Sequence, residues 1–239
     1  MRHPSPVLHL VPMEELRPTQ LTVGYREVLQ KAKAWRMAKG PASSKVLARH
    51  VAPAVVGPKG RYYIVDNHHL IRALHDDGAP GVFVQVLRDL SRLAKSEFWT
   101  TLDLHGWVHT YDEEGRRTDF AAIPKRIADL KDDPYRSLAG ELRRAGGFAK
   151  DATPYAEFLW AEFFRPRIKK SNLVDHFDAT FAKAAKMAHD PDADHLPGWC
   201  GPKGNVVAQA KDRLEMSIKK TRKLTAAKAI GLLEKKPSV

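Results

Sequence analysis

Residues 51–78 hold the feature that most constrains the fold of this chain. Two β-rich runs, 51–56 and 61–65, are separated by Gly57-Pro58-Lys59-Gly60, a sequence typical of a tight turn. The second run ends in Asp66-Asn67, whose side chains often cap helices, and Leu70, Ile71 and Leu74 then recur on one side of a helix. We therefore expect a β-hairpin whose second strand leads directly into a helix.

The segments around this hairpin complete a small α+β unit. We expect a strand over 7–11, an amphipathic helix over 24–38, a short helix over 43–49 and a buried strand over 81–87. The order strand, helix, hairpin, helix, strand is that of a compact domain over residues 1–90.

After residue 91 the pattern becomes mainly helical, which predicts a second domain over 91–239. A small hairpin or ordered loop is expected over 106–118. The expected helices span 91–104, 123–130, 137–145, 154–164 and 173–188, with a final basic helix.

Composition limits the cellular setting. The chain has 239 residues and a single cysteine, Cys200, so it forms no intrachain disulfide, which suits a reducing compartment. The apolar run over residues 7–13 is too short and too polar for a signal peptide. No segment has the apolar length of a membrane helix. We expect a soluble cytoplasmic protein without a membrane partner.

Asp66-Asn67-His68-His69, at the start of a helix, is the candidate site. The first amides of a helix have no internal partner and its dipole is positive there, so this turn suits a phosphate group. We expect Asn67, His68, His69 and Arg72 to bind phosphate, with His68, His69 and Asp66 as catalytic residues and Asp66 as a Mg²⁺ ligand. The alternative is that Asp66 or Asn67 is only a helix cap and the histidines are ordinary surface residues.

Two other segments, 132–136 and 154–164, contain residues of interest. Asp132 and Asp133 could bind a second metal or act as a base, although Asp133-Pro134 also reads as a simple helix start. Tyr135 and Arg136 follow them and could close over the first-domain pocket. The aromatic run 154–164 is expected to form the core of the second domain.

The final basic helix is a candidate contact for DNA. The chain carries a formal charge of +12, and lysines and arginines cluster in its last thirty or so residues, between Lys211 and Lys228. A solvated helix face packed on the domain is the alternative.

Several short motifs, taken in order, resemble the ParB-like nuclease family of the ParB/sulfiredoxin superfamily. They are VPMEELRPTQ at residues 11–20, VDNHH at 65–69, LKDDPYRSLA at 130–139, GGF at 146–148 and EFLWA at 157–161. The resemblance covers most of residues 7–170. It implies a small mixed-sheet domain with a pocket for ATP, ADP or CTP at Asp66–His69.

The sequence also departs from members of this superfamily. In its free serine kinases an arginine follows the two histidines, where Leu70 stands here. Gln20 occupies the place of a glutamate that acts as base, although Glu14 and Glu15 are close. The cysteine of the sulfiredoxins is missing from this turn, which excludes sulfinic acid reduction.

The leading hypothesis from the sequence is a nucleotide-binding enzyme that uses Mg²⁺ to hydrolyse a nucleotide or transfer a phosphoryl group. The alternatives are a DNA-binding partition-type protein, in which a nucleotide acts as a switch, and a DNA nuclease. The oligomeric state is not predicted.

Overall fold

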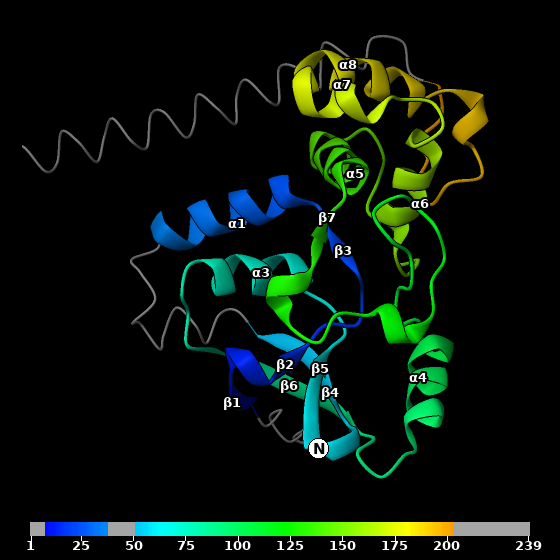
Figure 1. Cartoon of the computed structure of the whole chain (residues 1–239). Helices are drawn as coiled ribbons and strands as arrows, with labels where there is room; N and C mark the ends of the chain where they lie inside the picture. The colour runs from blue at the N-terminus through cyan, green and yellow to red at the C-terminus, as the bar shows by residue number, and fades with distance from the viewer. Residues whose placement is uncertain (1–7, 38–50, 203–239) are drawn as a thin grey trace, which may run out of the picture.

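The computed structural model describes residues 8–37 and 51–202 (Figure 1). The expected helix over 43–49 and the basic C-terminal helix lie outside these residues. The strands are β1 Leu8–Pro12, β2 Leu16–Arg17, β3 Thr22–Val23, β4 Ala52–Gly57, β5 Arg61–Ile64, β6 Gly81–Asp89 and β7 Lys131–Asp132. The α-helices are α1 Tyr25–Met37, α3 His68–Asp76, α4 Lys95–Leu104, α5 Pro134–Ala145, α6 Ala156–Phe164, α7 Lys170–Asp175 and α8 Phe177–Met187. Single 3-10 turns span Met13–Glu15, Pro58–Gly60, Phe120–Ala122, Ile127–Asp129 and Pro191–Ala193.

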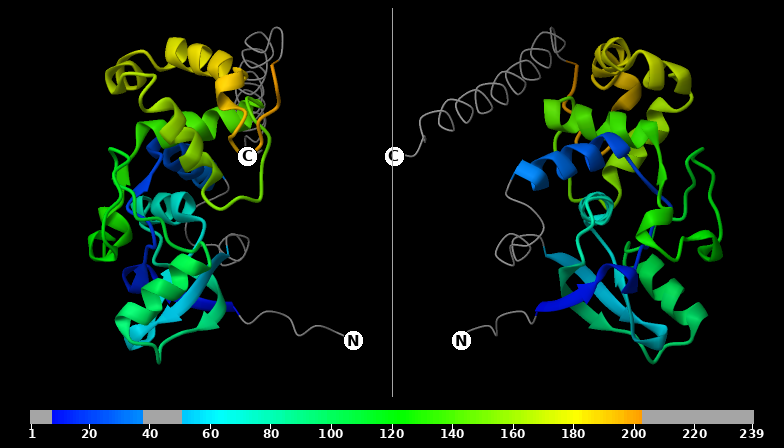
Figure 2. Two further views of the ribbon diagram at one scale, coloured as in Figure 1. Left: turned by 90° about the vertical axis from the view of Figure 1, so that its right-hand side faces the viewer. Right: turned by 60° about the vertical axis from the view of Figure 1, so that its left-hand side comes forward.

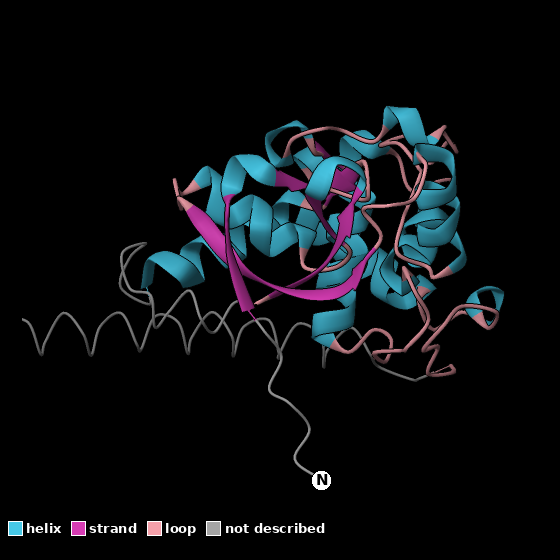
Figure 3. Ribbon diagram, turned by 90° about the horizontal axis from the view of Figure 1, so that it is seen from below, coloured by secondary structure: helices cyan, strands magenta, loops and turns pink. Residues whose placement is uncertain are grey.

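Five strands form a curled mixed sheet in the order β1-β6-β4-β5-β2 (Figure 3). The predicted hairpin is confirmed, since β4 pairs antiparallel with β5 and places Ala54 opposite Ile64. β6 pairs parallel with β4, and β2 pairs parallel with β5, so the sheet is mixed. Together with the helices that follow, this confirms the predicted α+β fold.

Helices α1 and α3 cover one face of the sheet. Val28, Ala32 and Trp35 are the buried positions of α1, at the helical spacing expected from the sequence. They share a core with Ile71 and Leu74 of α3. This core holds α3 in place. The candidate site lies at the start of α3, shortly after the end of strand β5.

The packing continues across residue 90. Ile127 and Leu130 belong to the same core as α1 and α3, and β7 pairs with β3 in a second, two-stranded sheet. Phe98 and Trp99 of α4 form another core with Val55 of β4. The predicted domain boundary at residue 90 remains a prediction. Residues from before and after it pack together in these two cores.

Helices α5 to α8 form the upper part of the molecule (Figure 2). Their core contains Leu138, Phe148, Trp160 and Phe164, and α5 contacts α1, which joins the two parts. In the described part of the chain, no helix is long and apolar enough to cross a membrane.

Two expected helices are wrong. Residues 123–130 form only the 3-10 turn Ile127–Asp129, because Pro124 interrupts the segment and its apolar side chains turn into the core below. Residues 173–188 form two helices, α7 and α8, separated at His176, whose backbone leaves the helical region at φ −137° and ψ 48°.

Candidate functional site

A cleft lies where the start of α3 faces α5 and α6. It consists of two adjoining cavities that share Asp66, His69, Arg136 and Glu157. One cavity, of about 390 Å³, has an aromatic side, and we call it the aromatic cavity. The other, of about 300 Å³, is lined mostly by charged residues, and we call it the charged cavity.

The first turn of α3 has no side-chain cap. Asn67 occupies the N-cap position in the left-handed region (φ 64°), and its side chain donates to the carbonyl of Val51 instead. Asp66 accepts a bond from the Asn67 amide at 2.6 Å, one residue before the helix. The interpretation of Asp66 or Asn67 as a capping side chain is therefore wrong, and the first amides of α3 remain available to an anion.

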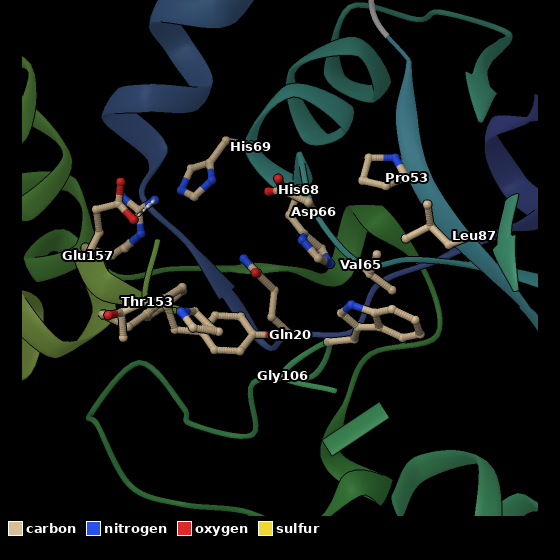
Figure 4. Close-up of a pocket in the computed structure, with 15 residues that line it drawn as sticks. Gln20, Pro53, Val65, Asp66, His68, His69, Leu87, Gly106, Thr153 and Glu157 are labelled. Atoms are coloured by element: carbon tan, nitrogen blue, oxygen red, sulfur yellow. Dashed lines mark ion pairs between the residues drawn. The ribbon is translucent and has the colours of Figure 1, made fainter. Parts of the chain in front are cut away.

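His68 and His69 are fixed by backbone N–H groups. The Thr19 amide donates to Nε2 of His68 at 3.1 Å, and the Gly24 amide donates to Nε2 of His69 at 2.9 Å. Because a backbone N–H can only donate, each Nε2 is the lone-pair nitrogen and each neutral ring carries its proton on Nδ1. Both residues line the aromatic cavity (Figure 4), and none of the hydrogen bonds of the described residues engages either Nδ1.

Burial keeps both rings neutral. Loss of solvent, together with the smaller effect of the neighbouring His109, lowers the pKa of His68 to about 3. Burial also lowers the pKa of His69 well below its usual value, and Arg136 adds to this, although Glu27 opposes it. The two histidines are therefore buried donors, and the interpretation of them as ordinary surface residues is wrong.

Arg136 of α5 lies in the wall that the two cavities share. It is 7 % exposed, and its guanidinium contacts Glu27 Oε2 at 3.5 Å and Glu157 Oε2 at 3.9 Å. These contacts are long, and its Nε has no hydrogen-bond partner among the described residues. Because Arg136 lines both cavities, the charge of its guanidinium would stabilise an anion in the cleft.

Glu27 balances the cations around the charged cavity. Its carboxylate lies 3.5 Å from Lys31, Arg136 and Arg144 and 3.8 Å from Nε2 of His69. Burial raises the pKa of Glu27, but the cations Arg136, Lys31 and Arg144 outweigh this effect and lower the pKa below its usual value. Glu27 is thus a fixed negative charge that holds Arg136 in place.

Two glycines make this arrangement possible. A Cβ on Gly24 would lie 2.8 Å from the backbone nitrogen of Ser137, so only glycine lets the Gly24 amide reach His69 at this helix crossing. A Cβ on Gly140 would lie 2.9 Å from Nη1 of Arg136 and 3.3 Å from Oε2 of Glu27. Gly140 therefore leaves the room that this ion pair occupies.

The aromatic cavity is lined by Trp107, Tyr155 and Phe158. The expectation that residues 154–164 form the helical core holds for Trp160, Phe163 and Phe164. Phe158 is also buried, at 6 % exposure, but it and Tyr155, one helical turn earlier, contact His109 and lie outside that cluster.

Among the predicted residues Gln20, Arg72, Glu14 and Glu15, only Gln20 lies at the cleft. Gln20 lines the aromatic cavity, where its Nε2 donates to the Thr22 carbonyl at 2.5 Å. Arg72 donates to the carbonyls of Ile127 and Leu130 and lines neither cavity. Glu14 and Glu15 are exposed on the 3-10 turn after β1.

The segment 132–135 is structural. Asp132 accepts from the amide of Tyr25, and Asp133 caps α5 and pairs with Arg165 at 2.8 Å. Tyr135 donates to the carbonyl of Ile168 within the helical core. Of the candidates at residues 132–136, only Arg136 reaches the cleft.

A magnesium ion at this site would need oxygen ligands from a bound phosphate as well as from the protein. No group of three or more histidine, cysteine or acidic side chains is placed to hold a metal ion within residues 8–37 and 51–202. Asp66 is exposed, lines both cavities and has no cationic partner in the described chain. It fits the single carboxylate of a hydrated Mg²⁺ whose other ligands are water and phosphate oxygens.

Sequence reasoning missed Glu27, Glu157, Arg143 and Tyr155. Each belongs to an amphipathic or aromatic helix, and the pattern within one helix does not show which helix will face it. The spacing between Glu157 and Arg143, whose ion pair measures 2.6 Å, is set by the packing of α5 on α6.

Comparison with known proteins gives two findings. A family model described as "Putative ParB-like nuclease" matches residues 9–166. The crystal structure of protein Atu1540 from Agrobacterium tumefaciens is similar, with 45% sequence identity and a TM-score of 0.77. The similarity covers 83% of this chain and 100% of that one. Among curated proteins, none matches the chain.

Proposed function

Because the chain belongs to the ParB-like nuclease family, we propose that the cleft binds the phosphate groups of a nucleotide such as ATP, ADP or CTP and promotes hydrolysis or phosphoryl transfer with Mg²⁺. The observation that carries this proposal is that His68, His69 and Arg136 line one cavity beside the uncapped start of α3. None of the hydrogen bonds of the described residues uses Nδ1 of His68 or of His69. Such a set suits a phosphate.

The histidines act as hydrogen-bond donors in this proposal. While the Gly24 amide donates to Nε2, Nδ1 of His69 holds the proton and cannot accept another. Acceptance of a proton by His69, as a catalytic base would require, would need the opposite tautomer. His68 and His69 therefore stabilise negative charge on the phosphate oxygens, as preorganised donors do.

The carboxylates divide the remaining roles. Glu27, with its pKa near 2, is a poor proton acceptor. Glu157 lines both cavities, and we propose that its carboxylate accepts the proton of the attacking water or hydroxyl group. Asp66 would hold Mg²⁺, which when bound neutralises phosphate charge and favours the developing transition state.

Cleavage of a nucleic acid is the second candidate function. It is favoured by the family description and by the formal charge of +12, which attracts a polyanion. The same phosphate site would then take a phosphodiester, and the basic C-terminal segment would supply DNA affinity, either for cleavage or for a partition-type role. The cleft, formed by α3 on one side and α6 on the other, favours the smaller ligand.

Phosphorus NMR of the full chain with Mg²⁺ and, in turn, ATP, ADP and CTP tests the proposal. We expect new phosphate signals with the wild type and with His75→Ala, and their loss in the His68→Gln/His69→Gln double variant. His75 is the matched control because it lies on α3, pairs with Asp76 and lines neither cavity.

Full turnover in the double variant would contradict the assigned site. Unchanged nucleotide signals with the wild type would refute the enzyme activity for these nucleotides. Binding of duplex DNA that falls steeply with salt, together with metal-dependent plasmid cleavage, would then favour the second candidate.

A further inference from the structure

The aromatic cavity contains a strained residue that phosphate binding does not use. Tyr155 stands at φ 59° and ψ 26°, in the left-handed region that favours glycine and asparagine. Its hydroxyl oxygen is buried and has no hydrogen-bond partner within the described residues. Both features cost free energy, and strain of this kind is concentrated at functional sites.

The ring of Tyr155 is held in position by its neighbours. It lies 4.8 Å from the ring of His109, which in turn lies 4.0 Å from Phe158 and 4.9 Å from Tyr111. Burial lowers the pKa of His109 to about 4, so this ring is neutral at pH 7. The cluster is therefore a rigid, uncharged support for the ring that lines the cavity.

Trp107 lines the same cavity from a different segment. It follows Gly106, which is at φ 63°, and its indole packs on the His105 ring at 4.5 Å. The helical core is already filled by Trp160, Phe163 and Phe164, so Trp107, Tyr155 and Phe158 are not needed there. Aromatic side chains at the wall of a cavity offer stacking surfaces to a planar ring.

We propose that the aromatic cavity binds the base of the nucleotide by stacking on Tyr155 and Trp107, next to the phosphate site at His68 and His69. This inference rests on the proposed function and adds which part of the ligand occupies which cavity. The aromatic cavity, at about 390 Å³, is in the size range of small-molecule sites, and His68 lines it together with Tyr155 and Trp107. The phosphates then lie between this cavity and the charged one, at Arg136.

Stacking also defines the expected selectivity. Every base has a π-face, so the rings select a nucleotide over an inorganic phosphate chain more strongly than one base over another. The Tyr155 hydroxyl keeps its proton, since burial raises its pKa and Asp66 adds to this effect. The hydroxyl is therefore uncharged and does not repel a phosphate.

Calorimetric titrations of the full chain with ATP, CTP and inorganic tripolyphosphate, each with Mg²⁺, test this inference. The variants are Tyr155→Asn, which removes the ring while suiting the left-handed backbone, and Trp107→Leu. Leu159→Asn is the matched control, because Leu159 is 44% exposed on the same helix and lines neither cavity. We expect each test variant to bind ATP about 5- to 150-fold more weakly, with tripolyphosphate affinity unchanged.

Two outcomes would overturn the inference and leave the phosphate site standing. One is wild-type affinity for tripolyphosphate equal to that for ATP and CTP. The other is unchanged ATP affinity in both Tyr155→Asn and Trp107→Leu. If neither the nucleotides nor tripolyphosphate bind to the wild type, the proposed function fails together with the inference.

Discussion

Replacing Glu27 with glutamine should destabilise the protein by about 3 kcal/mol at pH 7. The carboxylate is 12 % exposed and lies beside Arg136, Arg144 and Lys31. Its pKa falls from 4.5 to about 2, and at about 1.4 kcal/mol per pKa unit this shift is worth roughly 3 kcal/mol of stability. Removing one partner of a buried ion pair costs about 3–5 kcal/mol, which agrees.

The pH dependence makes this prediction more specific. Because the folded-state pKa of Glu27 is depressed, its contribution is complete above the unfolded value of 4.5 and is lost as the pH falls toward 2. Urea unfolding of Glu27→Gln should therefore show the same deficit at pH 7 and pH 5. A loss below about 1 kcal/mol, as expected for an exposed pair, would refute the reasoning. Glu114→Gln is the control, since its pair with Lys170 is exposed.

Three further predictions concern the same cleft. Gly140→Ala should weaken ATP binding in calorimetry by displacing Arg136 Nη1, and it should lower the unfolding free energy, because loosening the buried pair of Arg136 with Glu27 outweighs the gain of up to about 1 kcal/mol from helix propensity; unchanged affinity would contradict the role of Arg136. Lowering the pH from 6.5 to 5 should cost about 1.6 kcal/mol of stability for each of His68 and His109, because these histidines take up protons in the unfolded chain and stay neutral in the folded protein; urea unfolding that is constant over this range would contradict their burial as neutral rings. Gly24→Ala should lower the thermal unfolding midpoint and weaken ATP binding, since a Cβ would meet the Ser137 backbone and shift the amide that orients His69; wild-type values for both would refute this packing.

Local signals in the sequence were sufficient for the hairpin and for helix α3. The turn at Gly57–Gly60 and the spacing of Ile71 and Leu74 depend only on neighbouring residues, so their structure could be predicted. His68 and His69 could be identified as a candidate site for the same reason, because a helix start is a local feature.

The rest of the cleft depends on contacts between segments far apart in the chain. Glu27 meets Arg136 across 109 positions, and Thr19 reaches His68 across 49. Arg72 looked like a ligand-binding residue on the helical wheel, but a later segment supplies the Ile127 and Leu130 carbonyls to which it binds. Such partners are decided by tertiary packing, which periodicity does not reveal.

The central claim is that His68 and His69 present Nδ1–H groups to the phosphates of a nucleotide, and imidazole ¹⁵N NMR tests it most directly. At pH 7 we expect two rings, assigned with His68→Gln and His69→Gln, that are neutral with the proton on Nδ1. Saturation with ATP and Mg²⁺ should shift their Nδ1–H signals and leave those of His75 unchanged. Rings that are charged or protonated on Nε2, or Nδ1–H signals that do not respond to saturating nucleotide, would contradict the account.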